Sequence, residues 1–378
     1  MKIMVMAHNL LTGGGAVVGK NIMANLPVVA PNHEYLMVCP AGLGYEQSIE
    51  RGDGIQIELV RNKGFLHRAF FETRNLNKMV RAFGPDLIWG LGNFALKRPG
   101  CRQALLLHEA HLFYPKRHYG RVSTTHGVRY TIRKHRLQRC LPSVDTVFCQ
   151  TETARRRFAE SFSTNARIRV CPNAVSDFVN IPQEVQEPDV LRPYRDRFKL
   201  FFLAAGVCPH RNFEAIVEVF TRHRKQLQDV VCVLTIDRSQ GKLSGPFLDE
   251  IRRLELDDCI VNVGPLTQRQ LATYYLSCEC LFLPTLLESF SGTYLESMQF
   301  GRPILTSDLD FAHDVCGNAA HYFDPWDADS IADSICELRD NASLRETLVA
   351  CGRDRLKTAF QPWPNVVREA LNDMNVPL

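Results

Sequence analysis

The sequence predicts an α/β protein built from two doubly wound parallel sheets in two domains. Short apolar runs alternate with longer amphipathic stretches along the whole chain, which is the pattern of repeated β-α units. The runs are nearly continuous in apolar residues, as expected of strands that helices cover on both faces. At 378 residues the chain is also longer than a single hydrophobic core usually supports.

The first half supplies seven predicted strands. They are residues 2–7, 35–39, 55–60, 86–90, 103–107, 146–149 and 168–171. Gly13-Gly14-Gly15 follows the first strand and precedes a predicted helix over 16–26. Because the apolar run at the start leads directly into a glycine loop, we interpret it as a buried strand and not as a signal peptide.

The second half repeats the pattern with six predicted strands. They are residues 200–204, 230–235, 259–263, 280–283, 303–306 and 321–323. A polar, proline-rich segment at 182–193 separates the two series and has the composition of a linker. We therefore predict a first domain over 1–182, a linker over 183–197, a second domain over 198–360, and a tail over 361–378 with a helix at 365–375.

The composition is that of a globular protein without a membrane-spanning helix. Hydrophobic residues make up 45% and charged residues 23% of the chain, and no apolar run reaches the roughly 18 residues that a spanning helix needs. The 13 cysteines are odd in number and include no Cys-x-x-Cys pair. Many stand in apolar runs, which favours buried free thiols in a reducing compartment, so we expect a cytoplasmic protein.

Positive charge is concentrated in one stretch. Residues 110–144 contain eight basic and no acidic residues, whereas the rest of the chain holds 37 basic and 41 acidic residues. The eight are Lys116, Arg117, Arg121, Arg129, Arg133, Lys134, Arg136 and Arg139. Such a field over 116–139 suits an anionic membrane surface or acceptor, and we expect no nucleic acid partner. A solvated helix face is the alternative interpretation.

Glu288 and Glu296 bracket the most informative motif of the chain. A predicted strand runs into a loop of Ser, Gly and Thr residues, which opens a predicted helix over 293–300. The unpaired amides at the start of a helix attract anions. A carboxylate beside a phosphate is repelled by it, so Glu288 and Glu296 are expected to bind hydroxyl groups instead. A sugar nucleotide carries both phosphates and hydroxyl groups. The alternative is a surface loop with two solvated acids.

Two further motifs follow first-domain strands. The run Gly13, Gly14 and Gly15 would let a ligand approach the backbone closely, although it is not a full dinucleotide fingerprint and also suits a flexible turn. His108-Glu109-Ala-His111 ends a predicted strand. Its spacing is wrong for a His-Glu-x-x-His zinc helix, and a histidine with a structural role remains the alternative.

The segment 263–325 resembles the nucleotide-binding half of the retaining GT-B glycosyltransferases of family 4, the glycosyl transferases group 1. Glu288-Ser-Phe-Ser-Gly292 and Glu296 keep the register of that family's Glu-Gly-Phe-Gly motif and its second Glu. Val263-Gly-Pro-Leu266, Gly301-Arg-Pro-Ile304 and Gly317-Asn-Ala-Ala320 are similar to other segments of the family. Ser289 and Ser291 depart from it, because glycines are usual there.

The resemblance implies two Rossmann-like domains that face each other across a cleft, with a C-terminal helix that crosses back to the first domain. It makes the first domain the acceptor side and the second the donor side. Arg211 matches the position of a family lysine, and Val207 replaces the family's first arginine. The planar guanidinium of Arg211 also suits a pyrophosphate on chemical grounds.

Site roles follow from the resemblance together with the chemistry of the residues. His108, Arg211 and Glu288 are the predicted catalytic residues, with Glu109 and His111 on the acceptor side. The predicted donor-binding residues are Gly13, Gly14, Gly15, Arg211, Ser289, Phe290, Ser291, Gly292, Thr293 and Glu296. We expect no metal ion and no cofactor, because no carboxylate pair is predicted to lie against the diphosphate.

The predicted activity is transfer of a hexose from a nucleoside-diphosphate sugar to an acceptor hydroxyl with retention, in polysaccharide or glycolipid biosynthesis. The expected partners are this donor and a glycan or lipid-linked acceptor. The protein would be metal-independent and cytoplasmic, attached peripherally to the inner face of the plasma membrane. The alternatives are a sugar-nucleotide epimerase with the same fold and a non-catalytic nucleotide-sugar binding protein.

Overall fold

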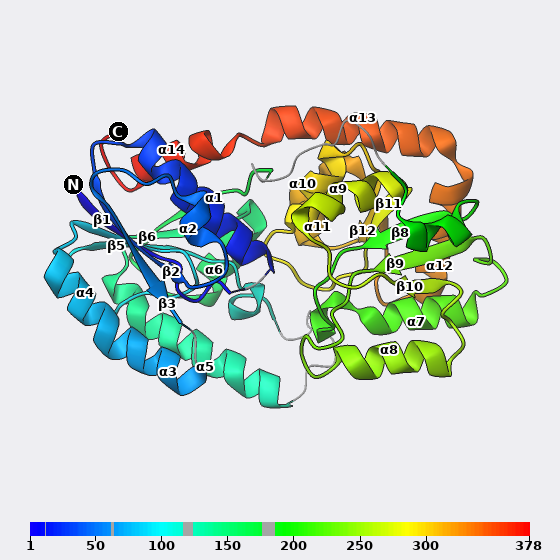
Figure 1. Ribbon diagram of the computed structural model, residues 1–378, viewed down its shortest axis with the longest axis horizontal. Helices are drawn as coiled ribbons and strands as arrows, with labels where there is room; N and C mark the ends of the chain where they lie inside the picture. The colour runs from blue at the N-terminus through cyan, green and yellow to red at the C-terminus, as the bar shows by residue number, and fades with distance from the viewer. Residues whose placement is uncertain (12, 62–63, 116–123, 176–185) are drawn as a thin grey trace. The chain divides into compact units, whose positions relative to one another are not determined.

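The structure is a computed structural model that describes residues 1–11, 13–61, 64–115, 124–175 and 186–378. The chain divides into two compact units, each with its own parallel sheet (Figure 1). Unit 1 contains the described residues of 1–114, 124–176 and 361–378, and unit 2 contains Pro115 and the described residues between 177 and 360. Both units are therefore α/β and doubly wound, as the sequence predicted.

The unit 1 sheet has seven parallel strands in the order β3-β2-β1-β4-β5-β6-β7. They are β1 (Lys2–Met6), β2 (Glu34–Pro40), β3 (Ile55–Val60), β4 (Leu87–Gly90), β5 (Arg102–Leu106), β6 (Thr146–Cys149) and β7 (Arg167–Val170). Each overlaps its predicted strand, and two of them have the predicted bounds. The strand predictions of the first half are confirmed.

Ten helical segments lie within the described residues of unit 1. They are α1 (Gly13–Val29), α2 (Tyr45–Ser48), α3 (Phe65–Phe70), the π-helical turn η1 (Phe71–Asn75), α4 (Leu76–Phe83), η2 (Ala110–Leu112), α5 (Thr124–Cys140), η4 (Leu141–Ser143), α6 (Glu152–Ser161) and α14 (Trp363–Asp373). Figure 1 shows α1 and α14 on one face of the sheet and α3, α4 and α5 on the other. The central strand β1 contributes side chains to the core on both faces of the sheet. Ile3 and Val5 pack with α1 and α14, whereas Met4 and Met6 pack with α4.

The C-terminal helix α14 belongs to the core of unit 1. Trp363, Val367 and Leu371 are buried in the same cluster as β1 and α1. The helix begins at Trp363, two residues before the predicted start, because Pro364 in the first turn needs no backbone hydrogen-bond donor there. The predicted return of the tail to the first domain is confirmed.

The glycine run requires a correction. We predicted a loop at 13–15 followed by a helix from residue 16, but all three glycines form the first turn of α1. Gly13 has φ of 64°, in the left-handed region that favours glycine. A Cβ atom at Gly13 or Gly14 would meet no atom of the described chain within 4 Å, so the backbone of this turn is open to a ligand.

The unit 2 sheet has six parallel strands in the order β10-β9-β8-β11-β12-β13. They are β8 (Phe198–Phe202), β9 (Val230–Leu234), β10 (Ile260–Asn262), β11 (Cys280–Leu283), β12 (Ile304–Ser307) and β13 (Ala320–Phe323). All six predicted strands are present. The predicted strand at 200–204 in fact begins two residues earlier, at Phe198.

The helical segments of unit 2 cover both faces of its sheet. They are η5 (Asp189–Tyr194), η6 (Pro209–Arg211), α7 (Phe213–Arg222), α8 (Ser244–Arg253), α9 (Gln268–Ser277), α10 (Gly292–Gln299), α11 (Asp310–Cys316), η7 (Gly317–Ala319), α12 (Ala328–Asp340) and α13 (Ala342–Ala359). In Figure 1, α7 and α8 lie on one face and α9, α10 and α11 on the other.

Two expectations from composition can be compared with the structure. All thirteen cysteines lie in the described chain as free thiols, as predicted. Among the described helices, none has both the length and the apolar character that a membrane crossing requires.

Candidate active site

The candidate donor site of unit 2 lies where the strand order of its sheet reverses. β8 and β11 are neighbours, and the chain leaves them toward opposite edges of the sheet. Ligands of open α/β sheets bind at the carboxyl ends of strands at such a point. The segments that follow these two strands carry Arg211 and Glu288, respectively.

Arg211 and Glu288 form a partly buried ion pair. Arg211 Nη1 lies 2.8 Å from Glu288 Oε1, and the two side chains are 23% and 12% exposed. The pairing depends on the turn η6, where the carbonyl of His210 accepts hydrogen bonds from the Leu286 amide at 2.7 Å and from Thr285 Oγ1 at 2.9 Å. These bonds fasten the turn of Arg211 to the loop of Glu288.

The pair leaves hydrogen-bonding capacity unused. Within the described chain, neither Arg211 Nη1 nor Glu288 Oε1 has a hydrogen-bond partner of regular geometry, although the two atoms face each other. Burial raises the pKa of Glu288, and the charge of Arg211 opposes that rise. Buried polar atoms are usually satisfied, so this pair is suited to a polar ligand.

The helix α10 begins at Gly292, in the segment that follows Glu288. Ser291 precedes it with φ of −99° and ψ of 112°, an extended conformation that serine adopts without strain. The replacement of the family's glycine at this position is therefore compatible with the backbone. Ser291 Oγ lies 2.8 Å from Thr293 Oγ1 and makes no capping bond to the helix. The first-turn amides and these two hydroxyls form a polar helix start.

Glu296 lies one turn further along α10 and is held by a residue that the sequence analysis did not identify. Tyr275 of α9 donates a hydrogen bond from its hydroxyl to Glu296 Oε2 at 2.9 Å. Burial raises the pKa of Glu296, and the bond from Tyr275 lowers it. The ring of Tyr275 packs against Phe201 and Phe300. A tyrosine in an amphipathic helix looks like a core residue in sequence, so no signal marked this contact.

Ser289 and Phe290, two other predicted donor-binding residues, are buried. The ring of Phe290 meets Phe360 edge-on, with ring centroids 6.0 Å apart. Gly292 begins α10, and a Cβ atom there would meet no described atom within 4 Å. Open space therefore adjoins the helix start, whereas Phe290 packs into unit 2.

The predicted acceptor-side residues all follow β5 in unit 1. His108 is partly buried, and burial lowers its pKa to about 4. Interactions with the Leu91 backbone and the Gln150 side chain act in the opposite direction and raise the pKa. Glu109 forms an ion pair with Arg133 of α5. His111 stacks on Tyr130, with ring centroids 4.2 Å apart and planes 8° apart.

Only part of the predicted basic stretch is described. Lys116, Arg117, Arg121 and the side chain of Arg129 lie outside what the structure describes. Arg136 is tied to the buried Glu72 by a 2.8 Å bond from its Nη2 atom. Arg68 Nε and His8 Nε2 lie 2.7 Å and 3.4 Å from the same carboxylate. Burial alone would raise the pKa of Glu72, but the bonds from these three residues lower it to about 2.

The predicted absence of a metal ion remains a prediction, and two carboxylate pairs in the sequence bear on it. Asp308-Leu-Asp310 and Asp327-Ala-Asp329 both have the spacing of a metal-binding Asp-x-Asp motif. Asp308 pairs with His313, and Asp327 caps α12. Across the residues open to description, no three His, Cys, Asp or Glu side chains gather as metal ligands.

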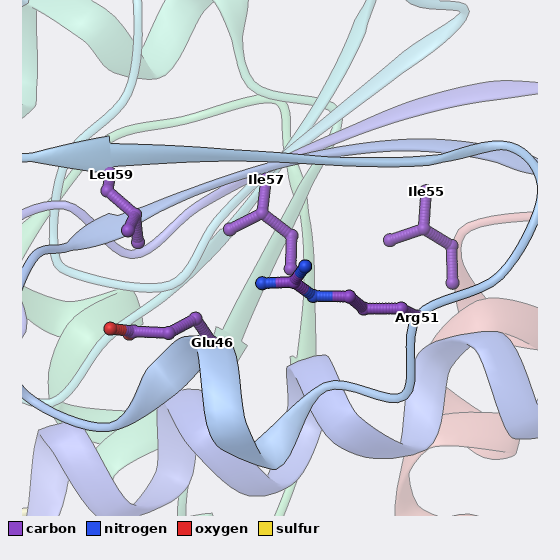
Figure 2. A pocket seen from close by; sticks show the side chains of 5 residues that line it. All are labelled: Glu46, Arg51, Ile55, Ile57 and Leu59. Carbon is purple, nitrogen blue, oxygen red and sulfur yellow. The ribbon is translucent and has the colours of Figure 1, made fainter.

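Two cavities within unit 1 lie away from these residues. One of about 280 Å³ lies beside α2 and the edge strand β3, where Glu46 and Arg51 flank Ile55, Ile57 and Leu59 (Figure 2). Another of about 410 Å³ is lined by residues such as Leu87, Arg102 and Thr146, at the amino ends of strands. Neither cavity is lined by a predicted site residue.

Two family models match the chain. The model described as glycosyl transferases group 1 matches residues 187–355, and the model described as glycosyltransferase family 4 matches residues 12–177. Together they span most of both units.

Curated relatives are similar over shorter stretches. The O-antigen chain mannosyltransferase RfbU of Salmonella typhimurium is 26% identical over 132 residues, which are 34% of this chain and 36% of that protein. The MMP alpha-(1->4)-mannosyltransferase of Mycolicibacterium hassiacum is 25% identical over 183 residues, 48% of this chain and 43% of that protein. The chain thus matches less than half the length of either relative.

A solved structure matches nearly the whole chain. Anabaena Alr3699/HepE in complex with UDP-glucose superposes with a TM-score of 0.72 at 15% identity, over 99% of this chain and 100% of the other. At this level of identity the likeness shows the fold, which is the predicted GT-B type with two Rossmann-like domains.

Proposed function

Because the chain belongs to the group 1 and family 4 glycosyltransferases, we propose that it transfers a hexose from a nucleoside-diphosphate sugar to an acceptor hydroxyl with retention. The observation that carries the proposal is the Arg211–Glu288 pair at the point where the strand order reverses, with Glu288 in the loop that leads into α10. A cation, an acid and a helix start together suit a ligand that has a diphosphate and hydroxyl groups.

In this proposal Arg211 and the first-turn amides of α10 bind the diphosphate. Negative charge grows on the leaving diphosphate as the bond to the sugar breaks, so a guanidinium and fixed backbone dipoles stabilise the transition state more than the ground state. The Ser291 and Thr293 hydroxyls add donors at the helix start. Arg211 would leave its contact with Glu288 in part to meet the phosphate.

Glu288 binds hydroxyl groups of the transferred sugar, and Glu296 binds those of the ribose. A carboxylate offers two oxygens, each able to accept a hydroxyl hydrogen. Tyr275 already occupies one oxygen of Glu296 and thereby sets the direction of the other. Ligand hydroxyls that donate to these acids favour their ionised form, against the burial that raises the pKa of both.

The unit 1 residues serve the acceptor side of the reaction. His108 would contact the transferred sugar as a neutral imidazole, because burial lowers its pKa to about 4. Glu109 and His111 would line the approach of the acceptor, and the open glycine turn of α1 would meet the donor diphosphate. The leaving phosphate takes the acceptor proton, so the reaction needs no separate base, metal ion or cofactor.

For the acceptor we propose a glycan or a lipid-linked glycan, in polysaccharide or glycolipid biosynthesis. The curated relatives are named as mannosyltransferases, so mannose is the first sugar to test. The described part of α5 exposes Lys134, Arg139 and also Ile132, whose exposed fraction is 55%. This combination supports peripheral attachment to an anionic leaflet on the cytoplasmic side.

A donor screen followed by product analysis tests the proposal. The purified chain is first mixed with GDP-mannose, UDP-glucose and related nucleotide sugars, and thermal shift identifies the donor. The donor is then incubated with a lipid-linked glycan acceptor, and NMR of the product reports the anomeric configuration. A product with the donor's configuration supports the proposal. Inversion excludes retention, and an altered sugar nucleotide formed without acceptor indicates an epimerase.

A further inference from the structure

Several polar side chains of unit 1 lie just beyond the ends of β5 and of the strands on both sides of it. β4 and β6 are the neighbours of β5, and β7 lies beyond β6. Asn93 follows β4, Gln150 follows β6, and Asn173 follows β7. His108 follows β5 itself, so these side chains flank it at the carboxyl edge of the sheet.

Asn93 holds the backbone at His108. Its Oδ1 atom accepts hydrogen bonds from two successive amides, those of His108 at 2.6 Å and Glu109 at 3.0 Å. The Asn93 amide in turn donates to the Leu106 carbonyl at 3.2 Å. Asn93 has φ of 56°, a left-handed conformation that asparagine tolerates better than most residues. Its side chain thus bridges the ends of β4 and β5.

The turn that carries Asn93 is tightly packed. A Cβ atom at Gly90 would lie 2.3 Å from the Phe94 carbonyl oxygen, and one at Gly92 would lie 1.9 Å from Asn9 Oδ1. Asn9 also donates a hydrogen bond from Nδ2 to the Gly92 carbonyl. The turn is therefore fixed between the ends of β1 and β5, and Asn93 presents its oxygen from a rigid support.

The imidazole of His108 is held from a second direction. It interacts with the backbone of Leu91 and with the side chain of Gln150. Gln150 Nε2 donates to Asn173 Oδ1 at 2.7 Å in a buried contact. The ring of His108 therefore lies against a glutamine side chain that Asn173 holds in place.

From these contacts we infer that Asn93 is a positioning residue for His108 and that Gln150 orients its ring. The inference rests on the proposed role of His108 at the transferred sugar. A ring whose backbone and side chain are both held meets the sugar in one geometry, and small misplacements of a catalytic group reduce turnover strongly.

Three variants of the full chain test this inference. Asn93→Gly keeps the left-handed backbone but removes the accepting oxygen, and Asn93→Asp keeps an oxygen at the same place. Asn375→Gly is the matched control, because Asn375 is an exposed left-handed asparagine of the same unit with φ of 52°. Each variant is assayed for kcat and donor KM, and NMR of labelled histidine follows the ring signals and pKa of His108.

We expect Asn93→Gly to lower kcat about 10- to 100-fold, with donor KM changed less than about twofold. The ring signals of His108 should shift, and its pKa should rise toward the ordinary value as water enters. Asn375→Gly should remain close to the parent in both measurements. Asn93→Asp should keep kcat close to the parent value, although its negative charge raises the pKa of His108. Normal kcat and unchanged His108 signals in folded Asn93→Gly would overturn the inference, as would equal damage in Asn93→Asp.

The NMR measurement separates this inference from the proposed function. If neither the parent protein nor any variant transfers sugar, the proposed function fails. The NMR signals of His108 still show whether Asn93 positions the ring. If Asn93→Gly does not fold, Gln150→Met supplies the decisive comparison. It should shift the ring signals of His108, and unchanged signals would overturn the inference.

Discussion

Arg211 Nη1 lies 2.8 Å from Glu288 Oε1, and both residues follow strands that are adjacent in the unit 2 sheet but distant in sequence. The pair is partly buried, and Glu288 lies in the loop that leads into α10. An arginine held beside an acid is charged and oriented before a ligand arrives, and only part of its contact with Glu288 has to be given up to reach a phosphate.

We predict that Arg211→Ala lowers kcat by about 10²–10³, because the charge it opposes develops mainly in the transition state. Donor affinity should fall less. Steady-state kinetics with the identified donor give both values. Arg222→Ala is the control, since Arg222 is an exposed, ion-paired arginine of the same unit. A change in KM alone would assign Arg211 to ground-state binding.

We predict that Glu296→Ala weakens donor binding while the fold is kept. A charge-assisted hydrogen bond contributes about 1.5–3 kcal/mol, so calorimetry should show a loss of at least tenfold in donor affinity. Tyr275→Phe should cause a smaller loss, because it removes the hydroxyl that orients the carboxylate. Tyr274→Phe, in the same helix, is the matched control. Unchanged affinity in Glu296→Ala would refute the ribose role.

We predict that His108 makes unit 1 less stable in mild acid. Its pKa is about 4 in the folded chain, against an ordinary value of 6.5, because of burial. Between these values the unfolded chain binds a proton that the folded chain does not, so the free energy of unfolding falls as the pH is lowered. Above pH 6.5 this stabilisation is fully present.

The measurement is thermal unfolding at pH 7 and pH 5, followed by fluorescence of the buried Trp89 and Trp363 of unit 1. His108→Gln should lose less stability than the parent between these two pH values. His67→Gln is the control, because His67 is exposed. An equal loss in His108→Gln and the parent would contradict the prediction.

We predict that sugar transfer persists in excess EDTA, since Arg211 and the α10 amides supply the positive charge that a metal ion would otherwise provide. The assay compares rates before and after dialysis against the chelator. Loss of activity that Mg²⁺ or Mn²⁺ restores would be the contrary result, and the two Asp-x-Asp pairs would then be the first sites to substitute.

We predict salt-sensitive binding to anionic vesicles through α5. Each basic residue near such a surface contributes about 1 kcal/mol, and salt screens this attraction. Flotation should show less binding for a Lys134→Gln, Arg139→Gln double variant and for Ile132→Ser. Arg136 is a poor choice for substitution, because its loss would leave the buried Glu72 short of a partner. No binding by the parent at low salt would favour an acceptor that is not membrane-bound.

The sequence alone determined the strands and the motifs of this protein. Apolar runs such as 146–149 and 280–283 predict strands directly, because strands covered on both faces need continuous apolar residues. Glu288 and Glu296 were recognisable because a strand, a small-residue loop and a helix start follow one another along the chain. His108 was recognisable for the same reason, as a polar residue at the end of an apolar strand.

Only the tertiary structure decided which side chains meet. Arg211 pairs with Glu288 because β8 and β11 are adjacent, and Asn93 bonds to His108 because β4 lies beside β5. Tyr275 reaches Glu296, and Arg136 reaches Glu72, between helices that fold onto the same face. Periodicity records whether a residue faces the core, but it carries no information on strand order or on how helices pack. These partner residues therefore have no signature in the local sequence. They nevertheless set the charge and orientation of the site residues that the sequence motifs identify.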